Sequence, residues 1–143
     1  MDNTIGDLSD ELMVRCLVIA LGSNADSEHA FSIAKAELIK LGDVCHSSMV
    51  IGRDFTGRTQ AIYHNACVHL KLDEPCSMGV ICHKLKAIER LCGRTDDRNA
   101  VSMDLDVLAV SDGHGWSISQ KRLPFKAHER AGLSEVADFL LTH

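Results

Sequence analysis

The chain has 143 residues, a formal net charge of −5, 45% hydrophobic residues and 24% charged residues. This length predicts one domain with a buried core, and the acidic balance argues against a partner bound mainly through the phosphate backbone of nucleic acid. One Trp, one Tyr and four Phe also offer little aromatic surface on which nucleic-acid bases could stack.

Residues 1–12 are acidic and lack an apolar period, so we expect a flexible leader ahead of a single domain over residues 13–143. The leader lacks the basic segment and apolar stretch of a signal peptide. The longest apolar run, Cys16–Leu21, is far shorter than a membrane span. We therefore expect no membrane partner.

The first predicted elements are a strand and a helix. Val14–Leu21 is apolar throughout and predicts a strand that ends at the turn Gly22–Asn24. Asp26 or Ser27 can cap the helix that follows, which has an apolar stripe at helical spacing and runs to about Leu41.

Two further strands are predicted in the middle of the chain. Val44–Ile51 predicts the second strand, and Gly52–Thr59 is a polar loop with two glycines. Ile62–Leu72 then predicts a long third strand.

The last part of the chain contains another helix and another strand. Ser77 opens a helix that ends near Cys92, where Gly93 stops it. Ser102–Val110 predicts the fourth strand, and a turn at Asp112-Gly113 follows it. A short helix is expected in the tail, near Ser134–Leu141.

The order strand-helix-strand-strand-helix-strand predicts an α+β protein, the ferredoxin-like sandwich of two split βαβ units. In this arrangement both helices cover one face of an antiparallel sheet and leave the other face open. The order of strands and helices does not predict where the short tail helix packs on the sheet.

Alternation along the strands assigns side chains to the two faces of this sheet. The residues assigned to the core are Ala66, Val68, Leu70, Leu72, Leu105, Val107 and Ala109. The opposite face receives Tyr63 and Asn65 from the third strand, and Asp104 and Asp106 from the fourth. We expect these four polar side chains to share the open face.

Asp104 and Asp106 are separated by one residue, which puts their Cα atoms about 7 Å apart on one face. Two such carboxylates repel each other, and Mg²⁺ relieves this repulsion because it binds one or two carboxylates together with substrate phosphates. Arg94, at the end of the preceding helix, is typical of sites for polyphosphate chemistry. The alternative is an ordinary solvated strand face that bears two acids.

The six cysteines form no CxxC pair, and several fall within apolar segments. We interpret them as reduced side chains that pack as small hydrophobic groups. Reduced cysteines are typical of a cytoplasmic protein. The spacing does not match that of a zinc site.

Four segments carry a resemblance to a known family when they are taken in order: ALGSN, YHNACVHL, AIERLCGR and MDLDVL. Together they resemble the 6-hydroxymethyl-7,8-dihydropterin pyrophosphokinase family of folate biosynthesis, over about residues 14–133. The resemblance implies a ferredoxin-like fold, in agreement with the order of elements. It also implies transfer of diphosphate from ATP to the pterin hydroxymethyl group, with release of AMP.

The resemblance implies roles for individual residues. Asp104 and Asp106 would bind two Mg²⁺ ions and, with Arg94, form the catalytic set. The implied pterin-binding residues are Asn24, Phe55, Tyr63 and Asn65. The implied ATP-binding residues are Glu89, Arg94, Lys121, Arg122 and Arg130. The partners would be a pterin and ATP, bound by a monomer or a homodimer.

The chain departs from the family pattern at several positions. Val101 stands where a phosphate-binding arginine is expected, and the aromatic residue that covers the pterin is absent from the loop after Arg94. Phe125 stands where an adenosine-side histidine is expected, unless His128 replaces it. One alternative is therefore a catalytically impaired homologue that binds a pterin or a nucleotide without turnover. Another is a ferredoxin-like module that acts through protein contacts alone.

Overall fold

The computed structural model describes residues 8–53, 62–93 and 100–142. The strands are β1 (Met13–Ser23), β2 (Gly42–His46), β3 (Val50–Arg53), β4 (Ile62–Ser77), β5 (Asp104–Ser111) and β6 (Trp116–Ile118). The helices are α1 (Ser27–Ile39), α2 (Met78–Cys92) and α3 (Ala127–Val136), with short 3₁₀ turns at Gln120–Arg122 and Asp138–Leu141.

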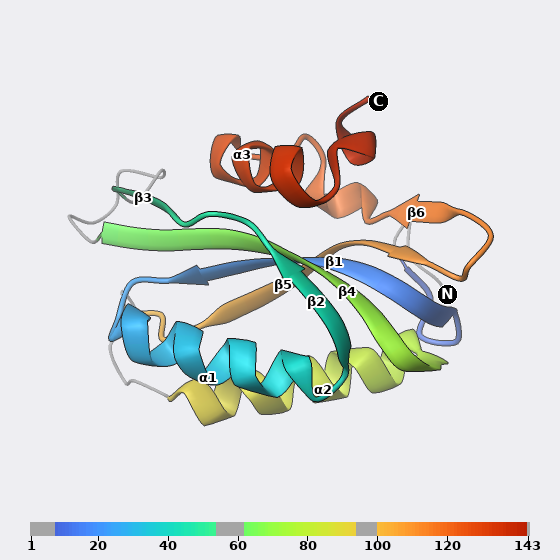
Figure 1. Ribbon diagram of the computed structural model, residues 1–143, viewed down its shortest axis with the longest axis horizontal. Coiled ribbons are helices and arrows are strands. Elements are labelled where there is room, and N and C mark those ends of the chain that lie inside the picture. The colour runs from blue at the N-terminus through green and yellow to red at the C-terminus, as the bar shows by residue number, and fades with distance from the viewer. Residues whose placement is uncertain (1–7, 54–61, 94–99, 143) are drawn as a thin grey trace.

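The strands form one six-stranded antiparallel sheet in the order β2-β4-β1-β5-β6, and β3 also pairs with β4. Helices α1 and α2 lie together on one face of this sheet (Figure 1). The predicted α+β ferredoxin-like fold is therefore confirmed. None of the helices in the described residues is long and apolar enough to cross a membrane.

Helix α3 covers part of the face that we expected to be open (Figure 1). Its residue Leu133 is fully buried in a second apolar cluster, the α3-side cluster, which includes Val18 and Cys67 from the sheet. A Cβ atom on Gly132 would lie only 2.7 Å from the Cys67 Sγ atom, so the glycine allows the helix to approach this closely. The expected open face is therefore corrected to a half-covered one.

Helix α3 also begins earlier than the predicted tail helix Ser134–Leu141. The Lys126 backbone N–H donates to the Glu129 Oε1 atom at 2.9 Å. This is one of the two hydrogen bonds of a capping box, the one from the N-cap backbone to the N3 side chain. Six of the ten residues of α3 are Ala, Arg, Glu or Leu, which favour helix, and Gly132 is the weakest helix former among the ten. The local sequence and the packing of Leu133 on the sheet therefore both favour a helix that starts at Ala127, ahead of the predicted Ser134.

The register of β5 contains a bulge at Leu108. Val107 pairs with Ile19, and Ala109 pairs with Val18, the neighbouring residue of β1. Leu108 is therefore an extra residue of β5 that has no partner in β1. A bulge shifts the alternation of the side chains that follow it. Ala109 therefore packs in the α3-side cluster with Leu108, and its predicted place beside Leu105 and Val107 was wrong.

The chain between β2 and β4 differs from the predicted pattern. The single predicted strand Val44–Ile51 is divided, because the Ser47 Oγ atom accepts a hydrogen bond from the Cys67 N–H between β2 and β3. Strand β3 continues through Arg53, into the predicted loop Gly52–Thr59. The rest of that loop lies outside the described residues.

The two helix starts differ in their capping. Ser77 caps α2, because its Oγ atom accepts from the Val80 N–H at 3.3 Å. Asp26 precedes α1 with a left-handed φ of 49° and makes no side-chain capping bond, since capping side chains normally act from an extended backbone. Ser27 is the first helical residue of α1.

The part of the expected leader that the structure describes contacts α2. The Asp10 carbonyl accepts a hydrogen bond from the Gly79 N–H at 2.9 Å, and the Leu12 carbonyl accepts one from the Met78 N–H at 2.8 Å. Leu8 and Leu12 pack against the main core. Residues 8–12 are thus attached to the fold.

Candidate active site

Strand pairing brings the predicted polar residues together in the sheet. In the central strand, Gly22 pairs with Asp104 on one side and with Asn65 on the other. Directly paired residues point to the same face of a sheet, so Asp104 and Asn65 flank Gly22 on the α3 side. A Cβ atom on Gly22 would lie 3.0 Å from the Asn65 Oδ1 atom. The glycine therefore leaves room for the Asn65 amide.

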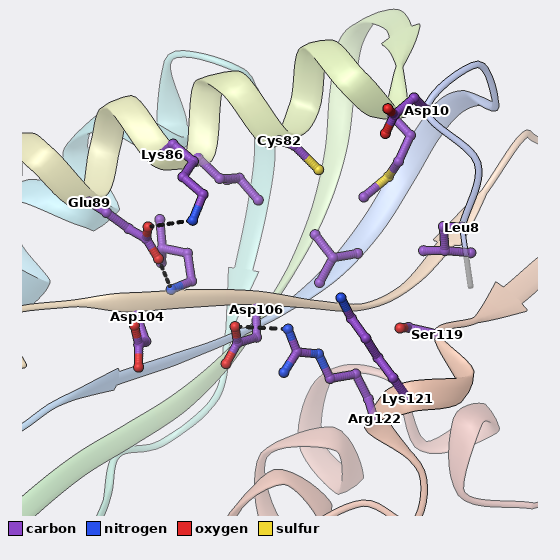
Figure 2. A pocket seen from close by; sticks show the side chains of 14 residues that line it. Leu8, Asp10, Cys82, Lys86, Glu89, Asp104, Asp106, Ser119, Lys121 and Arg122 are labelled. Carbon is purple, nitrogen blue, oxygen red and sulfur yellow. Dashed lines mark hydrogen bonds and ion pairs between the residues drawn. The ribbon is translucent and has the colours of Figure 1, made fainter. Parts of the chain in front are cut away.

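Two cavities meet at the carboxylate pair, and both are lined by Asp104 and Asp106. The larger cavity has a volume of about 420 Å³ and also receives Lys86, Glu89, Lys121 and Arg122 (Figure 2). The smaller cavity has a volume of about 130 Å³. It also receives Arg53, Tyr63, Asn65, Lys126, His128 and Glu129.

The two cavities differ in chemistry. The larger cavity combines three cationic side chains with four carboxylates, those of Asp10, Glu89, Asp104 and Asp106, which suits phosphates that bind together with a divalent cation. The smaller cavity offers the aromatic ring of Tyr63 and the amide of Asn65, an apolar face beside a group that both donates and accepts hydrogen bonds. The carboxylates stand where a ligand in one cavity would meet a ligand in the other.

The carboxylate pair carries excess negative charge. Burial raises the pKa of Asp104, and the neighbouring Asp106 raises it further. Arg122 offsets part of this charge, because its Nη2 atom lies 3.0 Å from the Asp106 Oδ1 atom (Figure 2). Lys86 and Lys126 also act on Asp104 and lower its pKa.

Glu89 supports the strand that carries the two aspartates. Its carboxylate accepts a hydrogen bond from the Leu105 N–H at 2.8 Å, and the Lys86 Nζ atom lies 3.9 Å away (Figure 2). Strand β6 pairs with β5 only at 109–111, so this end of β5 lies at the sheet edge. Burial raises the pKa of Glu89.

Asp104 and Asp106 are oxygen donors of the kind that Mg²⁺ binds. Among the residues that the structure describes, no group of three or more His, Cys, Asp and Glu side chains is placed to hold a metal ion. Asp104 and Asp106 supply two hard oxygen donors on one face. Mg²⁺ usually binds through one or two carboxylates, water and substrate phosphates, and the pair meets this requirement.

Some predicted residues lie away from both cavities. Asn24 does not line either one, because its Oδ1 atom accepts from the Val101 N–H at 2.5 Å and its own N–H donates to the Val101 carbonyl at 2.9 Å. Arg130 is exposed on α3, outside the lining of both cavities. Phe55 and Arg94 lie outside the described residues.

Sequence reasoning missed Lys86, Lys126 and Glu129. Lys86 lies one helical turn before Glu89, and this spacing could have indicated it. No comparable signal marks Lys126 and Glu129, because they reach the smaller cavity only through the packing of α3 on the sheet. His128 was noted as a possible substitute on the adenosine side, but it lines the smaller cavity, where burial lowers its pKa.

Comparison with known proteins agrees with the resemblance found in the sequence. The family model for 7,8-dihydro-6-hydroxymethylpterin-pyrophosphokinase (HPPK) matches residues 18–137. This range runs from β1 to the end of α3 and includes both aspartates. No curated protein matches the chain.

Proposed function

The chain belongs to the 7,8-dihydro-6-hydroxymethylpterin-pyrophosphokinase family, and from this premise we propose that it transfers diphosphate from ATP to 6-hydroxymethyl-7,8-dihydropterin and releases AMP. Membership supports a pyrophosphokinase role in folate biosynthesis. We further propose that ATP is the diphosphate donor, that this pterin is the acceptor and that Mg²⁺ is the metal.

The observation that carries the proposal is the position of Asp104 and Asp106 between two cavities. A transfer between two bound substrates requires adjoining sites with the reacting groups at their junction. The larger cavity suits the nucleotide, because Lys86, Lys121 and Arg122 can neutralise its phosphates. The smaller cavity suits the pterin, whose flat ring matches Tyr63 and whose polar edge matches Asn65.

In this proposal Asp104 and Asp106 hold two Mg²⁺ ions, which would neutralise charge on the triphosphate and on the leaving AMP. Lys121 and Arg122 orient the phosphates within the larger cavity. Glu89 acts as a positioning residue for β5 through its bond to the Leu105 N–H. Arg94 and Arg130 stay predicted ATP ligands, and Phe55 and Asn24 stay predicted pterin ligands.

The proposed transfer is a displacement at the β-phosphorus of ATP. The pterin hydroxymethyl oxygen forms a bond to this phosphorus, and the bond from the phosphorus to the oxygen that bridges the α-phosphate breaks. AMP leaves with that electron pair, and the hydroxyl proton passes to solvent. Catalysis of this kind depends on positioning and on charge stabilisation more than on covalent chemistry.

The test is to incubate the protein with MgATP and 6-hydroxymethyl-7,8-dihydropterin and to separate the nucleotides by chromatography. We expect AMP to form in equal amount with the pterin diphosphate. Asp104→Ala and Asp106→Ala should abolish AMP formation while the protein stays folded. Absence of AMP with wild-type protein, or ADP as the product, would refute the proposed activity.

A second candidate is a homologue that binds a pterin or a nucleotide without turnover. It is favoured by Val101, which has no cationic group, and by Phe125, which is buried in the α3-side cluster. Loss of one charge-stabilising group can cost several kcal/mol in the transition state. Calorimetric binding of pterin together with the absence of AMP would support this candidate.

We further propose that the protein acts in the cytoplasm, because its cysteines are free thiols in the described residues. Its partners would be the two small molecules and not a nucleic acid or a membrane. Whether it works as a monomer or as a homodimer stays a prediction, and sedimentation would decide between the two.

A further inference from the structure

Lys126 lies at the start of α3 and lines the smaller cavity together with both aspartates. The resemblance assigned it no role. Its side chain is exposed, so the ammonium group can reach a ligand in this cavity without being buried first.

The backbone of Lys126 is held in place from two sides. Its N–H donates to the Glu129 Oε1 atom at 2.9 Å, and its carbonyl accepts from the Arg130 N–H at 2.8 Å. Glu129 is only 4% exposed, so this anchor is itself fixed. The base of the lysine side chain is therefore positioned by the fold.

The charges near Asp104 come from both cavities. Lys86, Arg122 and Lys126 each act electrostatically on this carboxylate. Lys86 and Arg122 line the larger cavity, whereas Lys126 alone of the three lines the smaller one. A cation that acts on Asp104 is thus supplied to the smaller cavity by the N-cap residue of α3.

Two other groups of the smaller cavity can carry a positive charge. Burial lowers the pKa of His128 more than the neighbouring Glu129 raises it, so folding disfavours the charged imidazole. Arg53 also lines this cavity and enters it from the end of β3. Val101, at the expected arginine position, lines neither of these two cavities.

We propose that Lys126 is a catalytic residue that binds the diphosphate as it moves from the larger cavity to the smaller one. This inference rests on the proposed function. As the bond from the β-phosphorus to the bridging oxygen breaks and the bond to the pterin oxygen forms, the negative charge of the diphosphate enters the smaller cavity. The Lys126 ammonium binds its oxygens there as a point charge.

The test compares Lys126→Met, Lys126→Arg and the control Lys84→Met, which removes an exposed lysine of α2 outside both cavities. We expect Lys126→Met to lower kcat about 100-fold with KM for ATP within about twofold of wild type. Lys126→Arg should recover most of the activity, and Lys84→Met should match wild type. The substitution keeps the backbone N–H that bonds Glu129, so all three proteins should unfold at the wild-type temperature.

A second measurement does not depend on turnover. Calorimetry with hydroxymethyl-dihydropterin and with its diphosphate should show that Lys126→Met loses affinity for the diphosphate, about 10-fold, but not for the unphosphorylated pterin. Equal loss for both ligands, or no loss, would overturn the role of Lys126, as would unchanged kcat. If wild-type protein forms no AMP, the proposed function fails, and the calorimetric comparison still decides whether Lys126 binds the diphosphate.

Discussion

The Arg122 Nη2 atom donates to the Asp106 Oδ1 atom at 3.0 Å, at the junction of the two cavities. Both side chains are partly exposed, at 27% and 36%, so the pair adds little to stability. The ion pair matters instead for the binding of a divalent cation. The guanidinium occupies an oxygen of the carboxylate that we propose as a magnesium ligand, so Arg122 and a divalent cation compete for Asp106.

Replacement of Arg122 by Met should therefore tighten the binding of Mn²⁺, a spectroscopic substitute for Mg²⁺, in the absence of nucleotide. We expect about a fivefold gain in Mn²⁺ affinity, because a partly exposed ion pair contributes about 1 kcal/mol at most. The same substitution should weaken binding of the nucleotide, because it removes a phosphate ligand from the larger cavity. Electron paramagnetic resonance titration with Mn²⁺ measures the first effect, and calorimetry with MgATP measures the second. Arg122→Lys is the control that keeps the charge, and unchanged Mn²⁺ affinity in Arg122→Met would refute the competition.

Replacement of Glu89 by Ala should destabilise the protein by about 2 kcal/mol, because it leaves the buried Leu105 N–H without its acceptor. Glu89→Gln keeps an acceptor oxygen and should lose much less. Urea denaturation of the three proteins measures the difference in the free energy of unfolding. Equal stability of the Ala and Gln variants would show that this bond does not support β5.

The raised pKa of Asp104 predicts the pH dependence of stability. A carboxyl group whose pKa is raised by folding favours the folded state when it is protonated, and this contribution is lost as pH rises through the folded pKa. At pH 7 the charged Asp104 is therefore destabilising. Asp104→Asn should raise the free energy of unfolding at pH 7, by less than about 1 kcal/mol because the site is solvated.

This gain should shrink as pH falls through the raised pKa of folded Asp104, and it should be lost below the ordinary pKa of an aspartate, where wild-type Asp104 is protonated in both states. Urea denaturation at several pH values tests the trend. A variant that is less stable than wild type at pH 7 would contradict the interpretation that burial and the neighbouring Asp106 disfavour the charged form of Asp104. The same variant should form no AMP, so stability and activity should change in opposite directions.

Replacement of Gly132 by Ala should displace α3 from the sheet. The added Cβ atom would lie 2.7 Å from the Cys67 Sγ atom and 3.2 Å from the Cys67 backbone nitrogen. Overpacking of this kind costs about 1–3 kcal/mol, which exceeds the gain of about 1 kcal/mol in helix propensity from glycine to alanine. Affinity for the pterin should fall as well, since two residues of α3, His128 and Glu129, and its N-cap Lys126 line the smaller cavity.

A double-mutant cycle with Cys67→Ala isolates this contact. Removal of the sulfur should recover part of the stability that Gly132→Ala loses. Thermal unfolding and calorimetric titration with the pterin provide the two measurements. Strictly additive effects would mean that the contact between Gly132 and Cys67 does not set the position of α3.

The sequence predicted the face of the sheet on which the site lies. Alternation in β4 and β5 put Asn65 with Asp104 and Asp106, and the register through Gly22 confirms that Asn65 and Asp104 share a face. This prediction succeeded because alternation is a local property of extended backbone and needs no knowledge of distant contacts. The same locality explains the cap at Ser77 and the helix end at Gly93.

The tertiary structure decided which groups surround the two aspartates. The bulge at Leu108, the bond from Leu105 to Glu89 and the ion pair of Arg122 with Asp106 all depend on how separate elements meet. Helix α3 brings Lys126 to the smaller cavity because Gly132 can lie against Cys67. A strand's own period assigns its side chains to a face, but only the packing of distant segments selects the partners those side chains find there.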